Sequence, residues 1–362
     1  MLPFVCGNLF ILSRKKEMER WCLYLCFSLL FLSACSRGVS SDKVGVVVSV
    51  EDLETLDWAR LAAENGINTI GTHVNPGDVL PFIQSAKGKK FLSDCASLGI
   101  QVEHQLHAMS YLLPRELYAE DSTLFRMNEY GHRVADFNCC ATSEKALDII
   151  AHKAAEYARL MPSTNHRYYF WLDDGAPMCQ CPDCSGYTDS EKALLIENRI
   201  VEELRKVDEK AQLAHLAYHN TMVAPRKVKP ADGIFLEFAP FFRSWDAPIT
   251  DVAAKGRTGQ VNSDIYGQLL ENLEVFPVET AEILEYWMDV SLYSNWKKPA
   301  VKLPWKQDIF EKDVEAYAKL GIRNMTTFAV YIDSAYVADY RDLSFLRQYS
   351  TTLKHIEKRI GE

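Results

Sequence analysis

Hydrophobic runs alternate along the chain with segments whose hydrophobic positions recur at helical spacing. Residues 44–50 form a continuous β-branched run, which is typical of a strand buried on both faces. Residues 51–65 place leucines and alanines near helical spacing and stop at Gly66, which predicts a helix. The same alternation predicts further strands over residues 67–73, 100–107, 167–173, 212–218, 233–238, 281–287 and 322–330, and helices over residues 87–98, 143–160, 190–207, 263–275, 307–320 and 343–360.

This repeated order predicts the fold. Eight strands alternate with helices and no G-x-G-x-x-G motif follows the first strand, so the pattern favours a closed (β/α)8 TIM barrel over a doubly wound sheet. A long excursion over residues 108–141 follows the third strand, and residues 221–232 are expected to lack a full helix. We predict a single α/β domain over residues 44–362.

In such a barrel, functional side chains come from the carboxyl ends of the strands and from the loops that follow them. Here these positions are rich in His, Asp, Glu and Tyr, and the loops add aromatic residues. A polar floor with an aromatic rim is expected of a sugar-binding cleft. The residues predicted to bind substrate are His73, His107, Tyr111, Tyr218, His219, Tyr286, Trp287 and Trp296.

Composition and charge argue against one class of partner. The chain has 362 residues, of which 48% are hydrophobic and 25% charged, a balance typical of a globular protein with a full core. The formal net charge is −9, and no basic run follows the N-terminal segment. Because nucleic acid requires a basic face, we do not expect it as a partner.

The N-terminal segment is typical of a secretion signal. Basic residues precede an apolar stretch over residues 21–32 that is too short to span a bilayer comfortably, and Leu32-Ser33-Ala34-Cys35 follows. Small residues before a cysteine look like the lipobox of a bacterial lipoprotein. On this interpretation residues 1–34 are the signal, Cys35 carries the lipid, residues 35–43 are a tether, and the protein is anchored in the cell envelope through this lipid only. The alternatives are an ordinary secretory signal or a membrane helix, with Cys35 incidental.

The sharpest candidate for chemistry is Asp173-Asp174-Gly175, which follows the aromatic fourth strand. Two nearby carboxyl groups do not ionise easily together, so the pKa of one is raised and it becomes a general acid for a glycosidic oxygen. Adjacent strand residues point to opposite sides, so the two can act together only if the chain turns there, and Gly175 supplies a turn. The alternative is that Asp-Asp-Gly is only a turn or a helix-capping segment.

Three cysteines lie within six residues, at Cys179, Cys181 and Cys184. Their spacing resembles a zinc knuckle, and a closed tetrahedral site needs a fourth ligand. Cys139 and Cys140 are the candidates, since loops after consecutive strands lie side by side, and we favour Cys140. The alternative is a set of disulfides, which an envelope location permits. A catalytic metal is not expected, because a site made only of thiolates leaves zinc no open position, and no other cofactor is predicted for catalysis.

Several segments together resemble an uncharacterised bacterial family, the domain of unknown function DUF4838. The specific part is Asp173-Asp174 with the cysteine motif. Looser matches are Phe125-Arg126 with Gly131 and Arg133, Asn138-Cys139-Cys140, Asn198, Leu216-Ala217-Tyr218 and Leu284-Glu285-Tyr286-Trp287. The family is similar to glycoside-hydrolase barrels of the α-glucuronidase and β-hexosaminidase types. The aspartate pair also resembles that of family 84 β-N-acetylglucosaminidases, in which the 2-acetamido group of the substrate is the nucleophile. The resemblance implies that Asp173 orients that group and that Asp174 is the general acid/base.

The leading hypothesis is a glycoside hydrolase that acts on an oligo- or polysaccharide with an N-acetylated or uronic sugar. Asp174 is its general acid/base, Asp173 is the partner of Asp174, and Glu237 and Glu285 are reserve nucleophiles for a mechanism with two carboxylates. A second hypothesis is a glycan-binding lipoprotein that keeps the cleft without the reaction. A third is an envelope hydrolase or lyase that acts on another type of bond.

Overall fold

The computed structural model describes residues 43–360, with side chains described up to residue 356. The predicted signal, the predicted tether up to residue 42 and Cys35, the predicted site of lipid attachment, therefore lie outside the described residues. Within the described part, no helix has both the length and the apolar character needed to cross a bilayer.

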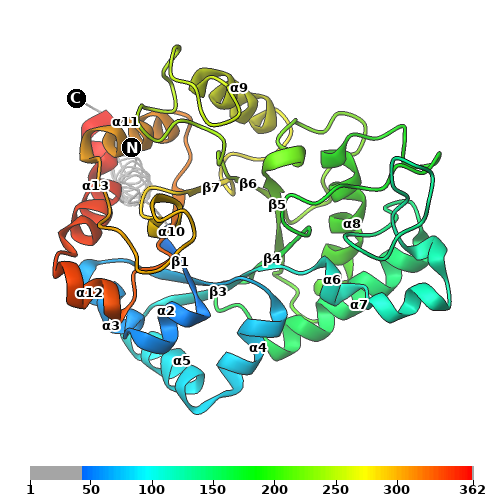
Figure 1. The fold of residues 1–362 in the computed structure, drawn as a ribbon, viewed down its shortest axis with the longest axis horizontal. Coiled ribbons are helices and arrows are strands. Elements are labelled where there is room, and N and C mark those ends of the chain that lie inside the picture. Colours follow the sequence, from blue (N-terminus) through cyan, green and yellow to red (C-terminus); the bar gives the residue numbers. More distant parts are fainter. Residues whose placement is uncertain (1–42, 361–362) are drawn as a thin grey trace, which may run out of the picture. The chain divides into compact units, whose positions relative to one another are not determined.

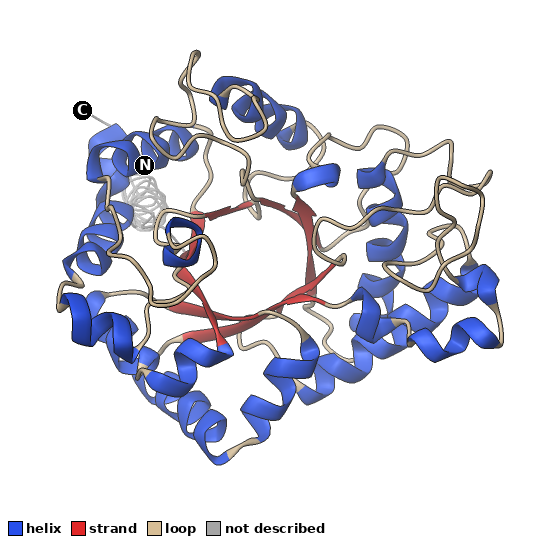
Figure 2. Cartoon of the chain, viewed as in Figure 1, coloured by secondary structure: helices blue, strands red, loops and turns tan. Residues whose placement is uncertain are grey.

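Eight parallel strands form a closed barrel (Figure 1). They pair in sequence order, and β8 returns to β1 with Gly45 beside Thr326. Helices surround the ring of strands on the outside (Figure 2). The predicted (β/α)8 barrel is thus confirmed. The strands are β1 (Lys43–Ser49), β2 (Thr69–His73), β3 (Gln101–His107), β4 (Arg167–Trp171), β5 (Gln212–Ala217), β6 (Ile234–Phe238), β7 (Glu282–Glu285) and β8 (Asn324–Phe328).

All eight predicted strands are present, and no end differs from its prediction by more than two residues. The helices are α2 (Val50–Thr55), α3 (Trp58–Asn65), α4 (Pro76–Gln84), α5 (Ala86–Leu98), α6 (Met109–Leu112), α7 (Glu144–Leu160), α8 (Asp189–Leu204), α9 (Asn262–Leu273), α10 (Val290–Tyr293), α11 (Gln307–Lys319), α12 (Ser334–Tyr340) and α13 (Ser344–Ile360), with 3-10 turns η1 (Arg115–Ala119), η2 (Ser122–Leu124) and η3 (His219–Thr221).

One predicted helix differs from the structure, and four helices were not predicted: α4, α6, α10 and α12. The single helix predicted over residues 51–65 is wrong, because Leu56 is extended and the side chain of Asp57 caps a new helix by accepting from the Arg60 N–H. Helix α4 was not predicted, although Asn75 caps it and Pro76 occupies its first turn, where a proline is tolerated. The connection from β5 to β6 contains only the short turn η3, as expected.

The two ends of the barrel interior differ in chemistry. At the amino ends of the strands, Lys43 Nζ donates to Glu103 Oε2 and to Glu282 Oε1 at 2.5 Å each, and to the Tyr169 hydroxyl at 2.9 Å. All four side chains are buried, so this end is filled by paired charges. The carboxyl ends of the strands instead surround an open cavity, where enzymes with this fold place their active sites.

Candidate functional site at the mouth of the barrel

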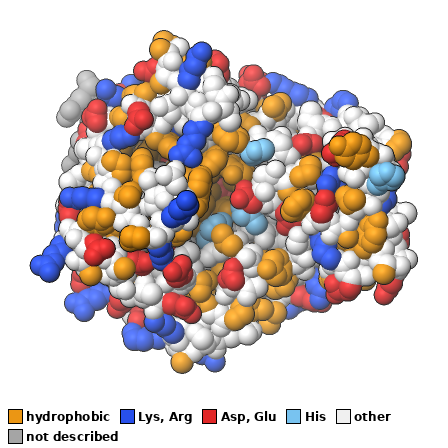
Figure 3. Space-filling model, viewed as in Figure 1, with side chains coloured by type: hydrophobic (Ala, Val, Ile, Leu, Met, Phe, Trp, Pro, Cys, Tyr) orange, Lys and Arg blue, Asp and Glu red, His pale blue; other side chains and the backbone are white. Residues whose placement is uncertain are grey.

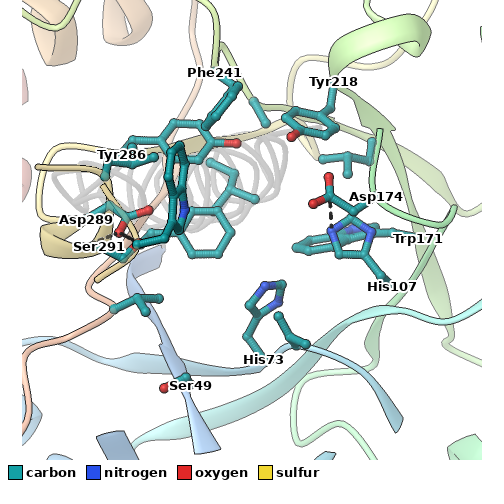
Figure 4. Close-up of a pocket in the computed structure, with 18 residues that line it drawn as sticks. Ser49, His73, His107, Trp171, Asp174, Tyr218, Phe241, Tyr286, Asp289 and Ser291 are labelled. Atoms are coloured by element: carbon teal, nitrogen blue, oxygen red, sulfur yellow. Dashed lines mark hydrogen bonds and ion pairs between the residues drawn. The ribbon is translucent and has the colours of Figure 1, made fainter. Parts of the chain in front are cut away.

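A cavity of 370 Å³ opens at the carboxyl ends of the strands. Figure 3 shows the hollow near the centre of this face, floored mainly by hydrophobic side chains. Figure 4 shows how the labelled residues surround it. The lining residues come from the end of every strand or from the loop that follows it: Ser49, His73, Val74, His107, Trp171, Asp174, Leu216, Tyr218, Ala239, Phe241, Leu284, Tyr286, Asp289, Ser291, Leu292, Trp296, Phe328 and Val330.

Asp174 brings a carboxylate into this cavity from the turn after β4. Its side chain is 65% exposed, and its Oδ1 lies 4.0 Å from Nε2 of His107 (Figure 4). Nδ1 of His107 lies 2.6 Å from the Leu172 carbonyl oxygen, which can only accept, so Nδ1 carries a proton and Nε2 faces Asp174. Gly175 follows with φ of 57°, the left-handed conformation that turns the chain here.

Asp173 is directed elsewhere. Its carboxylate accepts from the Ser110 N–H at 3.1 Å, from the Ser110 hydroxyl at 2.8 Å and from the Asn138 N–H at 2.8 Å. Asn138 Oδ1 in turn accepts from the Asp173 N–H at 2.9 Å. Asp173 does not line the cavity. It joins the loop after β3 to the end of β4.

His73 forms part of the cavity floor. Burial in the barrel, and next the proximity of His107, lower its pKa to about 3, so the imidazole is neutral at physiological pH. Its Nδ1 lies 2.8 Å from the Gln105 carbonyl oxygen and must donate to it. The ring packs against Trp171 and Phe328, with centroids 5.7 and 5.3 Å away. His73 therefore presents a neutral ring edge to a ligand.

Aromatic residues form much of the remaining wall. Tyr286 stacks on Phe328 with centroids 5.2 Å apart, and Phe241 meets Tyr218 and Tyr286 edge-on. Burial raises the pKa of both Tyr218 and Tyr286, and Asp174 adds to the increase, so both remain neutral phenols that can donate hydrogen bonds. Trp296 is 52% exposed at the rim.

Asp289 is a second carboxylate on the lining, and Figure 4 shows it across the cavity from Asp174. Burial raises its pKa to about 6, although Oδ1 accepts from the Ser291 N–H at 3.0 Å and from the Ser291 hydroxyl at 2.5 Å. Among the described lining residues, Asp174 and Asp289 are the two that carry carboxylates. The sequence analysis did not include Asp289 among the catalytic candidates.

The two reserve nucleophiles lie outside the cavity lining. Glu237 points into the barrel beneath Trp171, whose Nε1 donates to Glu237 Oε2 at 2.7 Å. Burial, and next the charge of Glu282, raise the pKa of Glu237 well above the usual range, which favours its protonated form. Glu285 points out of the barrel, where its Oε1 accepts from Arg243 Nη1 at 2.5 Å and from the Tyr317 hydroxyl at 2.7 Å.

Three predicted substrate-binding residues also lie outside the lining. Trp287 faces the surrounding helices, and its Nε1 donates to Asp313 Oδ2 at 2.9 Å. Tyr111 is 39% exposed on α6. His219 has φ of 49° and its ring packs near Phe242, with centroids 5.0 Å apart. The other five predicted substrate-binding residues, His73, His107, Tyr218, Tyr286 and Trp296, line the cavity.

A groove with basic residues adjoins the cavity beyond Leu292, which lines both. Arg257 lies over the rings of Trp245 and Trp296, with its guanidinium carbon 5.2 and 5.7 Å from their centroids. Lys255 also lines the groove. Cations next to aromatic rings suit a ligand that has both a negative charge and a flat apolar surface.

Structural comparison identifies the fold. The catalytic domain of the β-amylase from Paenibacillus polymyxa is 12% identical, with a TM-score of 0.50 over 89% of this chain and 99% of that one. The cold-adapted β-galactosidase from Rahnella sp. R3 is 11% identical, with a TM-score of 0.50 over 89% of this chain and 58% of that one. At these identities the likeness concerns the fold, which is a TIM barrel of the kind found in glycoside hydrolases.

Sequence comparison identifies the family. No curated protein matches the sequence. The profile of a domain of unknown function, DUF4838, matches residues 81–349, which include β3 to β8 and the cysteine motif. The chain therefore belongs to the DUF4838 family.

Proposed function

We propose that this protein is a glycoside hydrolase whose general acid/base is Asp174. The observation that carries the proposal is the position of Asp174, a solvent-accessible carboxylate at the edge of an aromatic-lined cavity at the carboxyl ends of the strands. Sugars present apolar faces to aromatic rings and hydroxyl groups to polar side chains, and this lining offers both.

Asp174 has the surroundings that proton transfer requires. A general acid must lie within hydrogen-bonding reach of the leaving oxygen, and Asp174 projects into the cavity beside His107 and Tyr218 (Figure 4). Nε2 of His107 faces the carboxyl group and lies 4.0 Å from its Oδ1. Asp173 positions the preceding strand end through its bonds to Ser110 and Asn138.

Asp289 is the second carboxylate of the proposed reaction. Positive charge develops on the sugar ring as the glycosidic bond breaks, and a carboxylate across the site stabilises it or attacks the anomeric carbon. With a pKa of about 6, Asp289 is mostly ionised at neutral pH and can take this part. We therefore assign it the place that the sequence suggested for Glu237 and Glu285, which do not line the cavity.

The adjoining groove supports an acidic sugar, such as a uronic acid, in the substrate. Arg257 and Lys255 supply positive charge there and Trp245 supplies a ring, while Trp296 lies on the cavity side of Arg257. The substrate is then an anionic oligo- or polysaccharide that extends from the cavity into this groove.

Hydrolysis of a panel of glycans tests the proposal. The panel pairs uronic-acid glycans with neutral and N-acetylated counterparts, and released reducing ends are measured for wild type, Asp174→Asn and Glu279→Gln. Glu279 is an exposed carboxylate that precedes β7, at the opposite end of the barrel from the cavity, and serves as the control.

We expect wild type and Glu279→Gln to hydrolyse an acidic glycan at similar rates. In Asp174→Asn the turnover of the same glycan should fall by about 10²–10⁴-fold. Undiminished turnover by Asp174→Asn would refute the assignment. Binding measured by calorimetry without any product would instead support the alternative of a glycan-binding protein.

We also propose that a lipid on Cys35 holds the protein in the cell envelope. The support is the signal-like sequence before Cys35, which lies outside the described residues. Metabolic labelling with a fatty acid in a bacterial host should label the wild type and not Cys35→Ala. Equal labelling of both proteins would contradict lipid attachment at this residue.

A further inference from the structure

Four buried cysteines form a cluster that the proposed reaction does not use. Cys140 comes from the loop after β3, and Cys179, Cys181 and Cys184 come from the loop after β4. Their Sγ atoms all lie within 4.8 Å of one another. Each side chain is at most 3% exposed, and the neighbouring Cys139 is not part of the group.

The spacing of the sulfur atoms is that of a metal site. Cys140 Sγ lies 3.7 Å from Cys181 Sγ and 3.9 Å from Cys184 Sγ. Four thiolates at about 2.3 Å from a tetrahedral zinc ion are separated by about 3.8 Å, whereas disulfide-bonded sulfurs are about 2.0 Å apart. All four cysteines are free thiols in the structure. The arrangement therefore matches four metal ligands better than two disulfides.

Hydrogen-bond donors surround the cluster, as metal-bound thiolates require. The Met127 N–H donates to Cys179 Sγ at 3.2 Å, and Arg133 Nη1 donates to the same sulfur at 3.7 Å. The Thr142 hydroxyl lies 3.3 Å from Cys184 Sγ. Four thiolates and one divalent cation leave two negative charges, which Arg133 partly compensates. Partners of this kind orient the ligands and tune the metal.

We propose that Cys140, Cys179, Cys181 and Cys184 bind one zinc ion that clamps the loop after β3 to the loop after β4. Thiolates are soft ligands, and a tetrahedral set of four selects zinc or iron, of which we assign zinc. All four coordination positions are taken by protein, so the ion has a structural role.

The clamp stabilises the wall that carries Asp174. Asn138, two residues before Cys140, bonds to Asp173 and donates through Nδ2 to the Pro177 carbonyl oxygen at 3.2 Å, two residues before Cys179. The same two loops are thus joined twice, by Asn138 near the cavity and by the cysteine cluster farther along each loop. Loss of the ion should loosen both loops while the barrel remains folded.

Metal analysis of the full chain, purified without chelator from zinc-supplemented cells, tests the proposal. Elemental analysis should find about one zinc ion per chain in wild type. Cys184→Ser should lose it, whereas the matched control Cys139→Ser, which changes a fully buried cysteine next to Cys140, should retain it. Iron in place of zinc, or loss of zinc from Cys139→Ser as well, would overturn the assignment.

A second measurement needs no variant and remains decisive if Cys184→Ser does not fold. A mercurial reagent is titrated into native wild type while a metallochromic dye records released zinc. Zinc should appear as the thiols react, and the stripped protein should be cut faster by protease within residues 109–142 and 176–187. Intact mass lower by about 2 Da for each disulfide, with no zinc released, would show that the cysteines are oxidised instead.

Discussion

At the end of β4 the side chains of Asp173 and Asp174 leave the chain in different directions. Asp173 accepts three hydrogen bonds from Ser110 and Asn138, and Asp174 reaches the cavity beside His107. The two aspartates therefore have separate roles: Asp173 holds the loop, and Asp174 is the residue proposed to contact the ligand. The family resemblance assigned both to the substrate, and in the present proposal only Asp174 touches it.

The two aspartates should respond differently to the same substitution. Asp173→Asn replaces one accepting oxygen with an NH₂ group that faces donors, so we expect it to lower the free energy of unfolding by about 1–3 kcal/mol. Asp174→Asn should change that free energy by less than about 0.5 kcal/mol, because the side chain is exposed. Urea unfolding of both variants checks this. A larger loss for Asp174→Asn than for Asp173→Asn would contradict these positions.

Asp289 predicts a pH dependence of stability. Burial raises its pKa from 3.8 to about 6, so at a pH between these values the folded protein keeps a proton that the unfolded chain has released. Ionisation therefore costs the folded state stability as the pH rises from about 4 to about 6, on the order of 3 kcal/mol in total.

Asp289→Asn removes this ionisation while an amide oxygen remains to cap α10. Relative to wild type, the variant should gain unfolding free energy between about pH 4.5 and pH 7. Urea unfolding of both proteins at several pH values measures the difference. A difference that stays constant across this range would show that Asp289 is not perturbed.

At the scale of elements, alternation along the strands decides which polar residues reach the cavity. On β7 and its extension, Glu282, Leu284 and Tyr286 point inward, whereas Glu285 and Trp287 point to the helices. Period-two alternation predicts this once one residue of the strand is placed. Glu285 and Trp287 could therefore have been separated from Tyr286 by sequence reasoning that respected alternation.

The strands themselves were predictable because each lies in a short segment that separates two helices or loops, often after a stop signal such as Gly66 before β2 and Gly99 before β3. The loops were less predictable. Helix α4 contains Pro81 in its interior, which normally indicates a break, although Asn75 as the cap and Pro76 in the first turn are signals that a helix begins here. Side-by-side loops made both Cys139 and Cys140 candidates for the fourth ligand, and the structure places Cys140 in the cluster.

The loop after β7 contributes Trp296 to the rim, and a stacking role there is testable. Trp296→Ala should raise KM for the glycan by roughly tenfold, equivalent to about 1.4 kcal/mol, with little change in kcat. Tyr130→Ala is the matched control, because Tyr130 is 76% exposed and does not line the cavity. Steady-state kinetics of both variants measures these changes in KM and kcat. An equal rise in KM for the two variants would show that Trp296 does not contact the substrate.

At the scale of the whole molecule, closure of the barrel gathers residues that are far apart in sequence. His73 ends β2, His107 ends β3, Asp174 follows β4, Tyr218 follows β5 and Asp289 follows β7, yet all line one cavity (Figure 4). The closed order of strands was predictable from the pattern. Which of these side chains reach the cavity was not predictable from the pattern, because the loop conformations determine it.

The most direct measurement of the central claim compares leaving groups in wild type and Asp174→Ala. A general acid is needed when the departing oxygen is a poor leaving group and hardly at all when it is a good one. Using glycosides of the sugar identified by the glycan panel, we predict that Asp174→Ala slows release of methanol by about 10²–10⁴-fold and release of 2,4-dinitrophenol by less than about tenfold. Equal slowing of both reactions would contradict the assignment of Asp174 as the proton donor.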